Sequence, residues 1–214
     1  MLLARERAEL VEFCHRMQAD ELTVGTSGNL SVRSGDHVAI TPSGTSYESL
    51  TPESICVITV SGEQVDGDLE PSSEVPMHTS VYQHTDAAAV VHTHPIYAST
   101  LSALVDELPP VHYMIALLGG PVRVAEYATY GSDELAANSV AAMEGRYGVI
   151  LRNHGATTYG ESLAKAYTRS VYLEWVSRMY YQARLIGEPR LLPPDEIDRV
   201  GKKLQGYGQT VTSS

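Results

Sequence analysis

Three histidines are placed where they could bind one metal ion. His92 and His94 flank Thr93 in an apolar segment that is predicted to be a strand. Successive side chains of a strand alternate between its faces, so these two imidazoles point the same way. His154 follows a second predicted strand, and three imidazoles suit a first-row transition metal, with an open fourth position for catalysis. The same spacing also fits solvated histidines at strand ends, and both interpretations stay open.

Glu74 lies in the first turn of a predicted helix. A carboxylate at that position is favoured by the helix macrodipole, whatever its function. Beside a metal ion, the same carboxylate could act as a general base. The sequence alone does not choose between these two roles. His78 and His84 continue the helical pattern, which favours side chains that pack or face solvent.

Three loops share glycines, hydroxyl side chains or a helix start, and they cover residues 25–29, 41–45 and 71–73. Backbone N–H groups freed by glycine, together with hydroxyls, can bind a phosphate without a cationic side chain. The same composition is also ordinary turn chemistry. No Walker loop or complete dinucleotide-binding glycine motif is present, so the sequence gives no support for nucleotide binding.

Helices and strands alternate along the chain. Hydrophobic periodicity, capping residues and breakers predict helices over residues 2–19, from the segment 71–74 to about 84, from Pro95 to 105, 132–143, 162–186 and up to 204. Strands are predicted over residues 30–32, 37–40, 55–60, 88–94, 111–117, 122–125 and 147–152. This alternation predicts an α/β fold with a sheet covered by helices on both faces, and the hairpin signals mean that the sheet is not purely parallel.

Composition excludes several classes of protein. The chain has 214 residues, which suits a single domain, and 15 Lys and Arg against 26 Asp and Glu give a net charge of −11. An acidic chain with three lysines is a poor binder of nucleic acid or of anionic membranes. The longest stretch without Asp, Glu, Lys or Arg, 87–105, contains His92, His94 and Pro95, which are costly in lipid. Two distant cysteines and the lack of a secretory signal favour a cytoplasmic protein.

Seven motifs, in order along the chain, strongly resemble those of the class II aldolase/adducin family. They are GTSGNLSVR, ITPSGTSY, PSSE, VVHTHP, VHYM, EYATYG and LRNHG. The resemblance runs from about residue 23 to about residue 207. It implies that residues 1–214 form one domain, with a tail at about 205–214. It implies a three-layer αβα sandwich around a mostly antiparallel mixed sheet, assembled as a homotetramer with active sites at subunit interfaces.

The resemblance also implies roles for particular residues. Zinc (or Mn²⁺, Co²⁺ or Fe²⁺) would be held by His92, His94 and His154, with Glu74 as a removable fourth ligand and the catalytic base. Tyr113 matches a tyrosine that acts from a neighbouring subunit. The residues that match the phosphate and substrate site are Thr26, Gly28, Asn29, Ser43, Gly44, Ser72 and Ser73. Two places depart from the bacterial pattern on the aldehyde side: the single residue Tyr130 and the segment Gln209-Thr210.

The implied activity is a metal-dependent retro-aldol cleavage. A ketose 1-phosphate such as L-fuculose 1-phosphate would yield dihydroxyacetone phosphate (DHAP) and an aldehyde such as L-lactaldehyde. The scarcity of lysine agrees with a metal route, because an imine mechanism needs a desolvated lysine. The alternatives are a pentulose-phosphate epimerase or a methylthioribulose-1-phosphate dehydratase of the same family. A non-catalytic adducin-like module is disfavoured because that branch lacks the metal histidines.

Overall fold

The computed structural model describes residues 1–205, and a nine-stranded sheet runs through its centre. The strands are β1 (Asn29–Ser34), β2 (His37–Ile40), β3 (Cys56–Thr59), β4 (Gln64–Asp66), β5 (Ala89–Thr93), β6 (Glu107–Leu108), β7 (Val122–Ala125), β8 (Gly148–Leu151) and β9 (Ala156–Gly160). Their order is β4-β3-β2-β1-β5-β9-β8-β7-β6. Only β7 and β8 pair in parallel among the described strands, which confirms the predicted mostly antiparallel mixed sheet.

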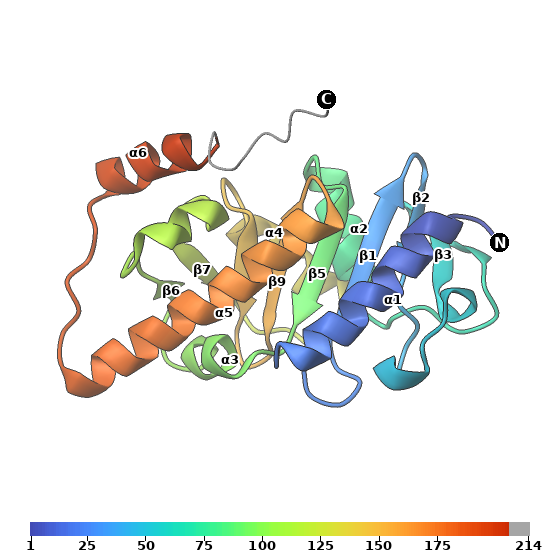
Figure 1. The fold of residues 1–214 in the computed structure, drawn as a ribbon, viewed down its shortest axis with the longest axis horizontal. Coiled ribbons are helices and arrows are strands. Elements are labelled where there is room, and N and C mark those ends of the chain that lie inside the picture. Colours follow the sequence, from blue (N-terminus) through green and yellow to red (C-terminus); the bar gives the residue numbers. More distant parts are fainter. Residues whose placement is uncertain (206–214) are drawn as a thin grey trace, which may run out of the picture.

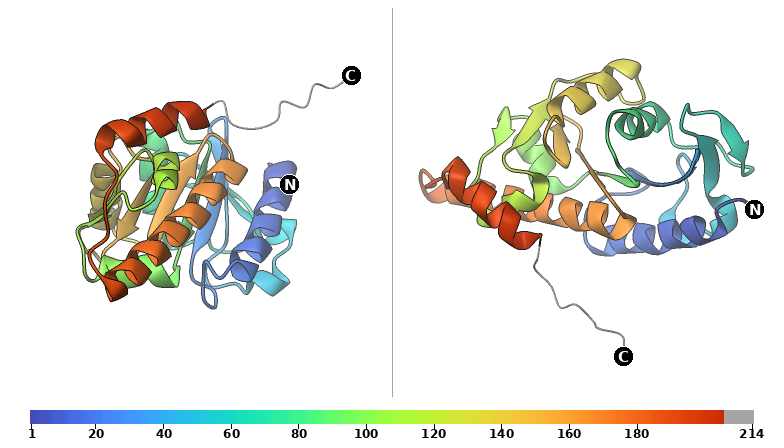
Figure 2. Two further views of the ribbon diagram at one scale, coloured as in Figure 1. Left: turned by 60° about the vertical axis from the view of Figure 1, so that its left-hand side comes forward. Right: turned by 90° about the horizontal axis from the view of Figure 1, so that it is seen from above.

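Helices cover both faces of this sheet (Figure 1). They are α1 (Ala4–Ala19), α2 (Val75–His84), α3 (Ile96–Ser102), α4 (Asp133–Ala142), α5 (Leu163–Ile186) and α6 (Pro194–Leu204). The view from above in Figure 2 separates α1 and α5 on one side of the sheet from α2 and α4 on the other. Each face is sealed by its own hydrophobic core, so the predicted three-layer αβα arrangement is confirmed.

Local sequence explains where most elements begin and end. The Ser132 hydroxyl accepts a hydrogen bond from the Leu135 backbone N–H at the start of α4, and Ser162 does the same for Lys165 in α5. Gly187 ends α5, and Pro95 follows the end of β5. These boundaries agree with the sequence prediction to within a few residues. None of the helices in residues 1–205 combines the length and apolarity needed to cross a membrane.

One predicted strand is wrong. The segment 111–117 contains a 3-10 helix, η3 (Tyr113–Leu118), in place of a strand. Ile115 and Leu118 are buried, and a spacing of three residues puts both on one side of a 3-10 helix. The His112 ring caps this helix by accepting a hydrogen bond from the Met114 N–H, and Gly119 ends it in a left-handed conformation.

Three strands were not predicted at all. β4 and β6 have three and two residues, which is too short to show a periodicity. β9 reads ATTYG and lacks the apolar alternation of a half-buried strand. It forms a strand because β5 and β8 pair with it on its two sides.

Candidate metal centre and active site

The β5 and β9 pairing brings the three histidines together. His92 lies within β5, His94 follows its end, and His154 lies in the turn that joins β8 to β9. That turn packs closely against β5, because a Cβ atom added to Gly155 would overlap the Thr93 carbonyl oxygen. No side chain larger than hydrogen fits there. The glycine therefore sets how closely His154 approaches the other two rings.

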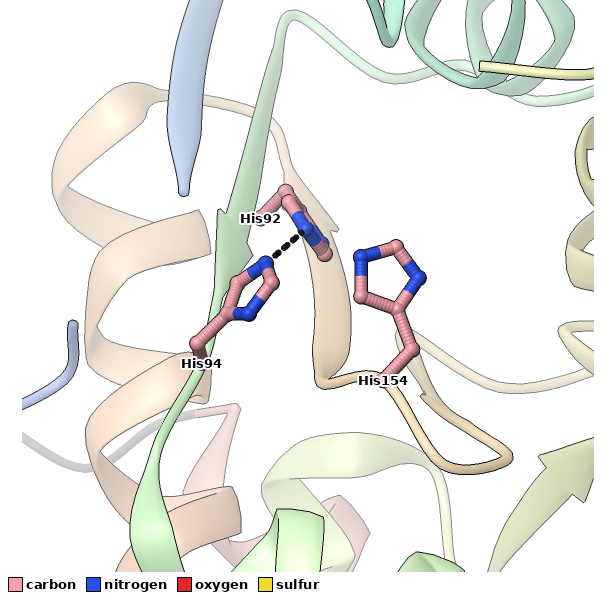
Figure 3. Close-up of side chains that lie close together, drawn as sticks. All are labelled: His92, His94 and His154. Atoms are coloured by element: carbon pink, nitrogen blue, oxygen red, sulfur yellow. Dashed lines mark hydrogen bonds between the residues drawn. The ribbon is translucent and has the colours of Figure 1, made fainter. Parts of the chain in front are cut away.

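The imidazoles form a triangle with ring centroids 4.8–4.9 Å apart (Figure 3). One nitrogen from each ring lies within 4.8 Å of the others, and the Nε2 atoms of His92 and His94 are 2.9 Å apart. This is the geometry of a group that could hold a metal ion. Solvated histidines at strand ends, the alternative left open by the sequence, do not describe this arrangement, since His92 is fully buried.

Two groups on β9 orient the ring of His92. Its Nδ1 lies 3.1 Å from the Ala156 carbonyl oxygen and 3.0 Å from Thr157 Oγ1. A carbonyl oxygen can only accept, so we assign the ring proton to Nδ1, which leaves the Nε2 lone pair facing the cluster. Burial lowers the pKa of His94 to about 3 and that of His154 to about 4. Both rings are thus neutral near pH 7, the state that binds metals.

Glu74 completes the cluster from the start of α2. Its carboxylate is 4% exposed, with Oε2 2.9 Å from His92 Nε2 and Oε1 3.7 Å from His154 Nε2. Burial raises the pKa of this carboxyl, but positive charge on His92, and to a smaller extent on His154 and His78, outweighs burial and lowers the pKa below its usual value. Glu74 is therefore a carboxylate whenever positive charge, from a protonated ring or from a bound cation, lies beside it.

With neutral histidine rings, the cluster has no positive charge to balance the Glu74 carboxylate. Although Oε2 is close to His92, neither Glu74 oxygen accepts a hydrogen bond from a described residue. A buried carboxylate without a partner is unfavourable by several kcal/mol, and here it faces the lone pair of His92. A divalent cation bound by the three histidines would satisfy both groups. The residues present therefore fit a metal site.

A pocket of about 320 Å³ opens directly beside the cluster. Its wall includes Glu74, His94 and His154, so the cluster is open to a ligand on one side. All seven residues assigned to substrate by resemblance also line it, namely Thr26, Gly28, Asn29, Ser43, Gly44, Ser72 and Ser73. No lysine or arginine is among the described lining residues. An anion there would be bound by hydroxyls, amides and backbone N–H groups.

Contacts between the three loops fix this wall. The Tyr47 hydroxyl lies 2.8 Å from the Ser27 and 2.7 Å from the Gly28 carbonyl oxygen, which it can reach as a donor. Gly28 has φ +84°, and a Cβ atom there would lie 2.9 Å from the His92 carbonyl oxygen. The second and third loops are joined where the Ser72 N–H donates to the Thr41 carbonyl oxygen at 3.0 Å. The loops therefore form one surface around the pocket.

Some residues lie elsewhere than the sequence suggested, and others were missed. Tyr113 is 47% exposed and lines a separate groove with Tyr172 and Trp175, so it does not reach the pocket of its own chain. Tyr127, Tyr130 and Asn153 line the pocket. Of these three, the sequence indicates only Tyr130 as an individual residue. The positions 209 and 210 lie outside the described residues.

The helical pattern predicts that His78 packs or faces solvent, and the structure shows it fully buried one helical turn after Glu74. Burial, with a smaller contribution from the nearby His92, lowers its pKa to about 3. It contacts Asn29 through Nε2 and Ser31 through Nδ1. Its spacing of four residues from Glu74, which puts both on one helix face, was the only available signal in the sequence.

The fold and site together define an αβα protein in which a three-histidine cluster, compatible with a metal ion, borders a small polar pocket. Residues 8–181 match the Class II Aldolase and Adducin N-terminal domain, and the chain belongs to the class II aldolase and adducin family. This confirms the resemblance carried by the seven motifs.

Similar proteins include several named sugar-phosphate aldolases. The 5-deoxy-D-ribulose 1-phosphate aldolase of Bacillus thuringiensis serovar kurstaki is 42% identical over 98% of this chain and 100% of its own. The L-fuculose phosphate aldolase of Escherichia coli K12 is 36% identical over 94% of each chain. A solved structure of an L-fuculose 1-phosphate aldolase superimposes with a TM-score of 0.93, at 40% identity, over 96% of this chain and 98% of its own.

Proposed function

We propose that this protein is a metal-dependent aldolase that cleaves a ketose 1-phosphate to DHAP and a short aldehyde. The observation that carries the proposal is the shared pocket: Glu74 and two of the histidines form one wall, and three loops of neutral hydrogen-bond donors form another. One wall fits a metal and a proton carrier, and the other fits a phosphate. The proposal treats the whole chain as one functional domain.

The metal would be held by His92, His94 and His154, with Glu74 as a fourth and removable ligand. Three histidines without cysteine, open to a pocket, favour a catalytic site over a closed structural one, and zinc is our first choice over Mn²⁺, Co²⁺ or Fe²⁺. When bound, the ion would polarise the substrate carbonyl and stabilise the negative charge of the enediolate.

The residues of the chain would bind the substrate and move its protons. Asn29, Ser43 and Ser73, with their loops, would bind the phosphate and so fix the position of the ketose. As the C3–C4 bond breaks, the C4 hydroxyl would give its proton to the Tyr113 oxygen of a neighbouring subunit, while the Tyr113 hydroxyl releases its own proton to solvent. The Glu74 carboxylate would take up a proton from solvent and deliver it to C3, which completes DHAP.

The relatives narrow the class of substrate. Cleavage of 5-deoxyribulose 1-phosphate between C3 and C4 leaves acetaldehyde beside DHAP, and L-fuculose 1-phosphate leaves L-lactaldehyde. Both aldehydes end in a methyl group. We therefore propose a terminal-deoxy ketose 1-phosphate, with the deoxypentulose as first candidate because that relative matches at 42% identity over its full length.

A panel of ketose 1-phosphates tests this function. We expect enzymatic detection to find DHAP released from terminal-deoxy substrates, with a higher kcat/KM than from substrates that carry a terminal hydroxyl. Each phosphate ester is paired with its unphosphorylated ketose, which should react far more slowly. Turnover without any DHAP would instead identify the epimerase or dehydratase of the same family. No turnover across the panel, with metal bound, would favour the adducin-like alternative.

Assembly gives a second test, because Tyr113 lies outside the pocket of its own chain. We propose a homotetramer in which Tyr113 completes the site of a neighbour, and light scattering should report four times the 23.2 kDa chain mass. Tyr113→Phe and Glu74→Gln proteins should each be inactive alone. After subunit exchange, some sites would contain both native residues, and part of the activity should return. Complete exchange without recovery would contradict the shared site.

A further inference from the structure

Four polar side chains form a buried hydrogen-bonded chain that ends at the pocket. The Tyr82 hydroxyl lies 2.7 Å from Ser31 Oγ, and Ser31 Oγ lies 2.6 Å from His78 Nδ1. His78 Nε2 lies 2.6 Å from Asn29 Oδ1. Tyr82, Ser31 and His78 are at most 2% exposed, and Asn29 is 8% exposed at the pocket wall. Solvent therefore reaches only one end of the chain.

The buried end decides the direction of these hydrogen bonds. The Val90 backbone N–H and Ser31 both lie at the Tyr82 hydroxyl. The N–H can only donate, so Ser31 Oγ is the described acceptor for the buried Tyr82 proton. The Ser31 hydroxyl is then free to donate to His78 Nδ1. A neutral imidazole that accepts at Nδ1 carries its proton on Nε2, and that N–H donates to Asn29 Oδ1. If the hydrogen bonds ran from His78 toward Tyr82, the Tyr82 hydroxyl proton would have no acceptor.

The far end of the chain is the amide of Asn29. With Oδ1 held by His78, the NH₂ group is the part left for the pocket, and no described residue accepts a hydrogen bond from it. Asn29 pairs with His92 across β1 and β5, so this NH₂ group lies beside the histidine cluster. An NH₂ group attracts an anion, whereas the amide oxygen in its place would repel one.

We propose that His78 is a positioning residue that locks the Asn29 amide with its NH₂ group toward the phosphate of the substrate. The proposal deepens the proposed function and rests on it for the identity of the anion. The lock works through the Nε2–H tautomer, which the buried Tyr82 and Ser31 hydroxyls select. His78 itself does not touch the substrate. It removes the amide rotamer that would oppose phosphate binding, so the site is preorganised.

The tautomer can be measured without any substrate. Long-range ¹H–¹⁵N NMR spectra of the metal-loaded enzyme distinguish a neutral imidazole protonated at Nε2 from one protonated at Nδ1. We expect His78 to be neutral with its proton on Nε2 at pH 7, and His78→Gln identifies its signals. A proton on Nδ1, or a charged ring, would overturn the proposal whatever the enzyme catalyses.

The function of the lock is tested with DHAP and with dihydroxyacetone, which lacks the phosphate. Proton exchange in deuterated water gives KM and kcat for each ligand. His78→Leu should raise the KM for DHAP about tenfold, the size of one lost hydrogen bond to a charged group, with little change in kcat. Its kcat/KM for dihydroxyacetone should stay within about twofold. His78→Gln, whose amide can donate from the position of Nε2, should restore most of the lost DHAP affinity.

Two reference variants separate the possible failures. Asn29→Ala should show the same selective loss as His78→Leu, and His84→Leu, an exposed histidine on the same helix, should behave as wild type. If Asn29→Ala loses DHAP selectivity and His78→Leu does not, the positioning role is wrong while the phosphate site stands. If neither variant changes the preference for DHAP, the phosphate assignment of Asn29 fails instead. An equal loss on both ligands in His78→Leu would also contradict the lock. If His78→Leu does not fold, the DHAP kinetics of His78→Gln and the NMR tautomer of His78 test the proposal instead.

Discussion

Glu74→Gln should almost stop proton exchange between solvent and the hydroxymethyl carbon of DHAP. A positioned general base contributes about 10²–10⁴-fold, and glutamine keeps the size of the side chain but cannot carry the proton. Glutamine fills the same buried space at the start of α2, so the variant should retain the fold and the three histidine ligands. NMR in deuterated water with DHAP alone measures the rate, so the identity of the aldehyde does not matter.

A carboxylate that only caps a helix would behave differently. Through the macrodipole it would contribute about 0.3–1 kcal/mol to stability and nothing to turnover. Glu134→Gln is the matched control, because Glu134 lies exposed in the first turn of α4. That variant should exchange DHAP protons at the wild-type rate. A wild-type rate in Glu74→Gln, with metal bound, would remove Glu74 from the mechanism.

Loss of the metal should have an effect of similar size. The purified enzyme should hold about one zinc-like ion per chain by elemental analysis, and His94→Ala should lose most of it. Substitutions behind a metal ligand already weaken binding 10–100-fold, so loss of a ligand should weaken it by more than about 100-fold. Activity should fall with metal content and return when the chelator-treated wild type is given Zn²⁺.

Metal binding should also raise the thermal stability of the protein. An ion that binds only the folded state at about 1,000 times its Kd adds about 4 kcal/mol to the free energy of unfolding. Thermal denaturation of the wild type should therefore shift upward with added Zn²⁺, while the triple alanine variant of His92, His94 and His154 should not respond. His84→Ala, which removes an exposed histidine, is the control. Full metal content in the triple variant would exclude this cluster as the site.

The sequence predicted most of the fold because its elements carry local signals. The apolar run before Pro95 predicts β5, and Ser132 and Ser162 predict the starts of α4 and α5. The alternating faces of a strand predict that His92 and His94 point together, and the structure agrees. The three loops were found by composition, and the motifs indicated that they serve one site.

What the sequence could not predict depends on contacts between distant segments. β9 is a strand only because β5 and β8 pair with it, and it lacks the periodicity of an independent strand. Residues 111–117 have the apolar content of a strand, but their packing selects a 3-10 helix. His78 is surrounded by Ser31 and Asn29 from β1, about 50 residues away, so a helical pattern alone reveals nothing of its role.

In the part of the chain that the structure describes, no lysine or arginine lines the pocket, and this affects how the proposed substrate and metal would reach it. With a net charge of −11, the long-range field of the chain attracts divalent cations and opposes the approach of a phosphate dianion. This field is screened over about 8 Å at physiological ionic strength, whereas hydrogen bonds from hydroxyls and amides act only at contact. Under the proposed function, recognition of the phosphate would begin after collision, and its strength should depend weakly on salt. The chain would attract its metal ion through long-range charge and would bind its anion through hydrogen bonds at contact.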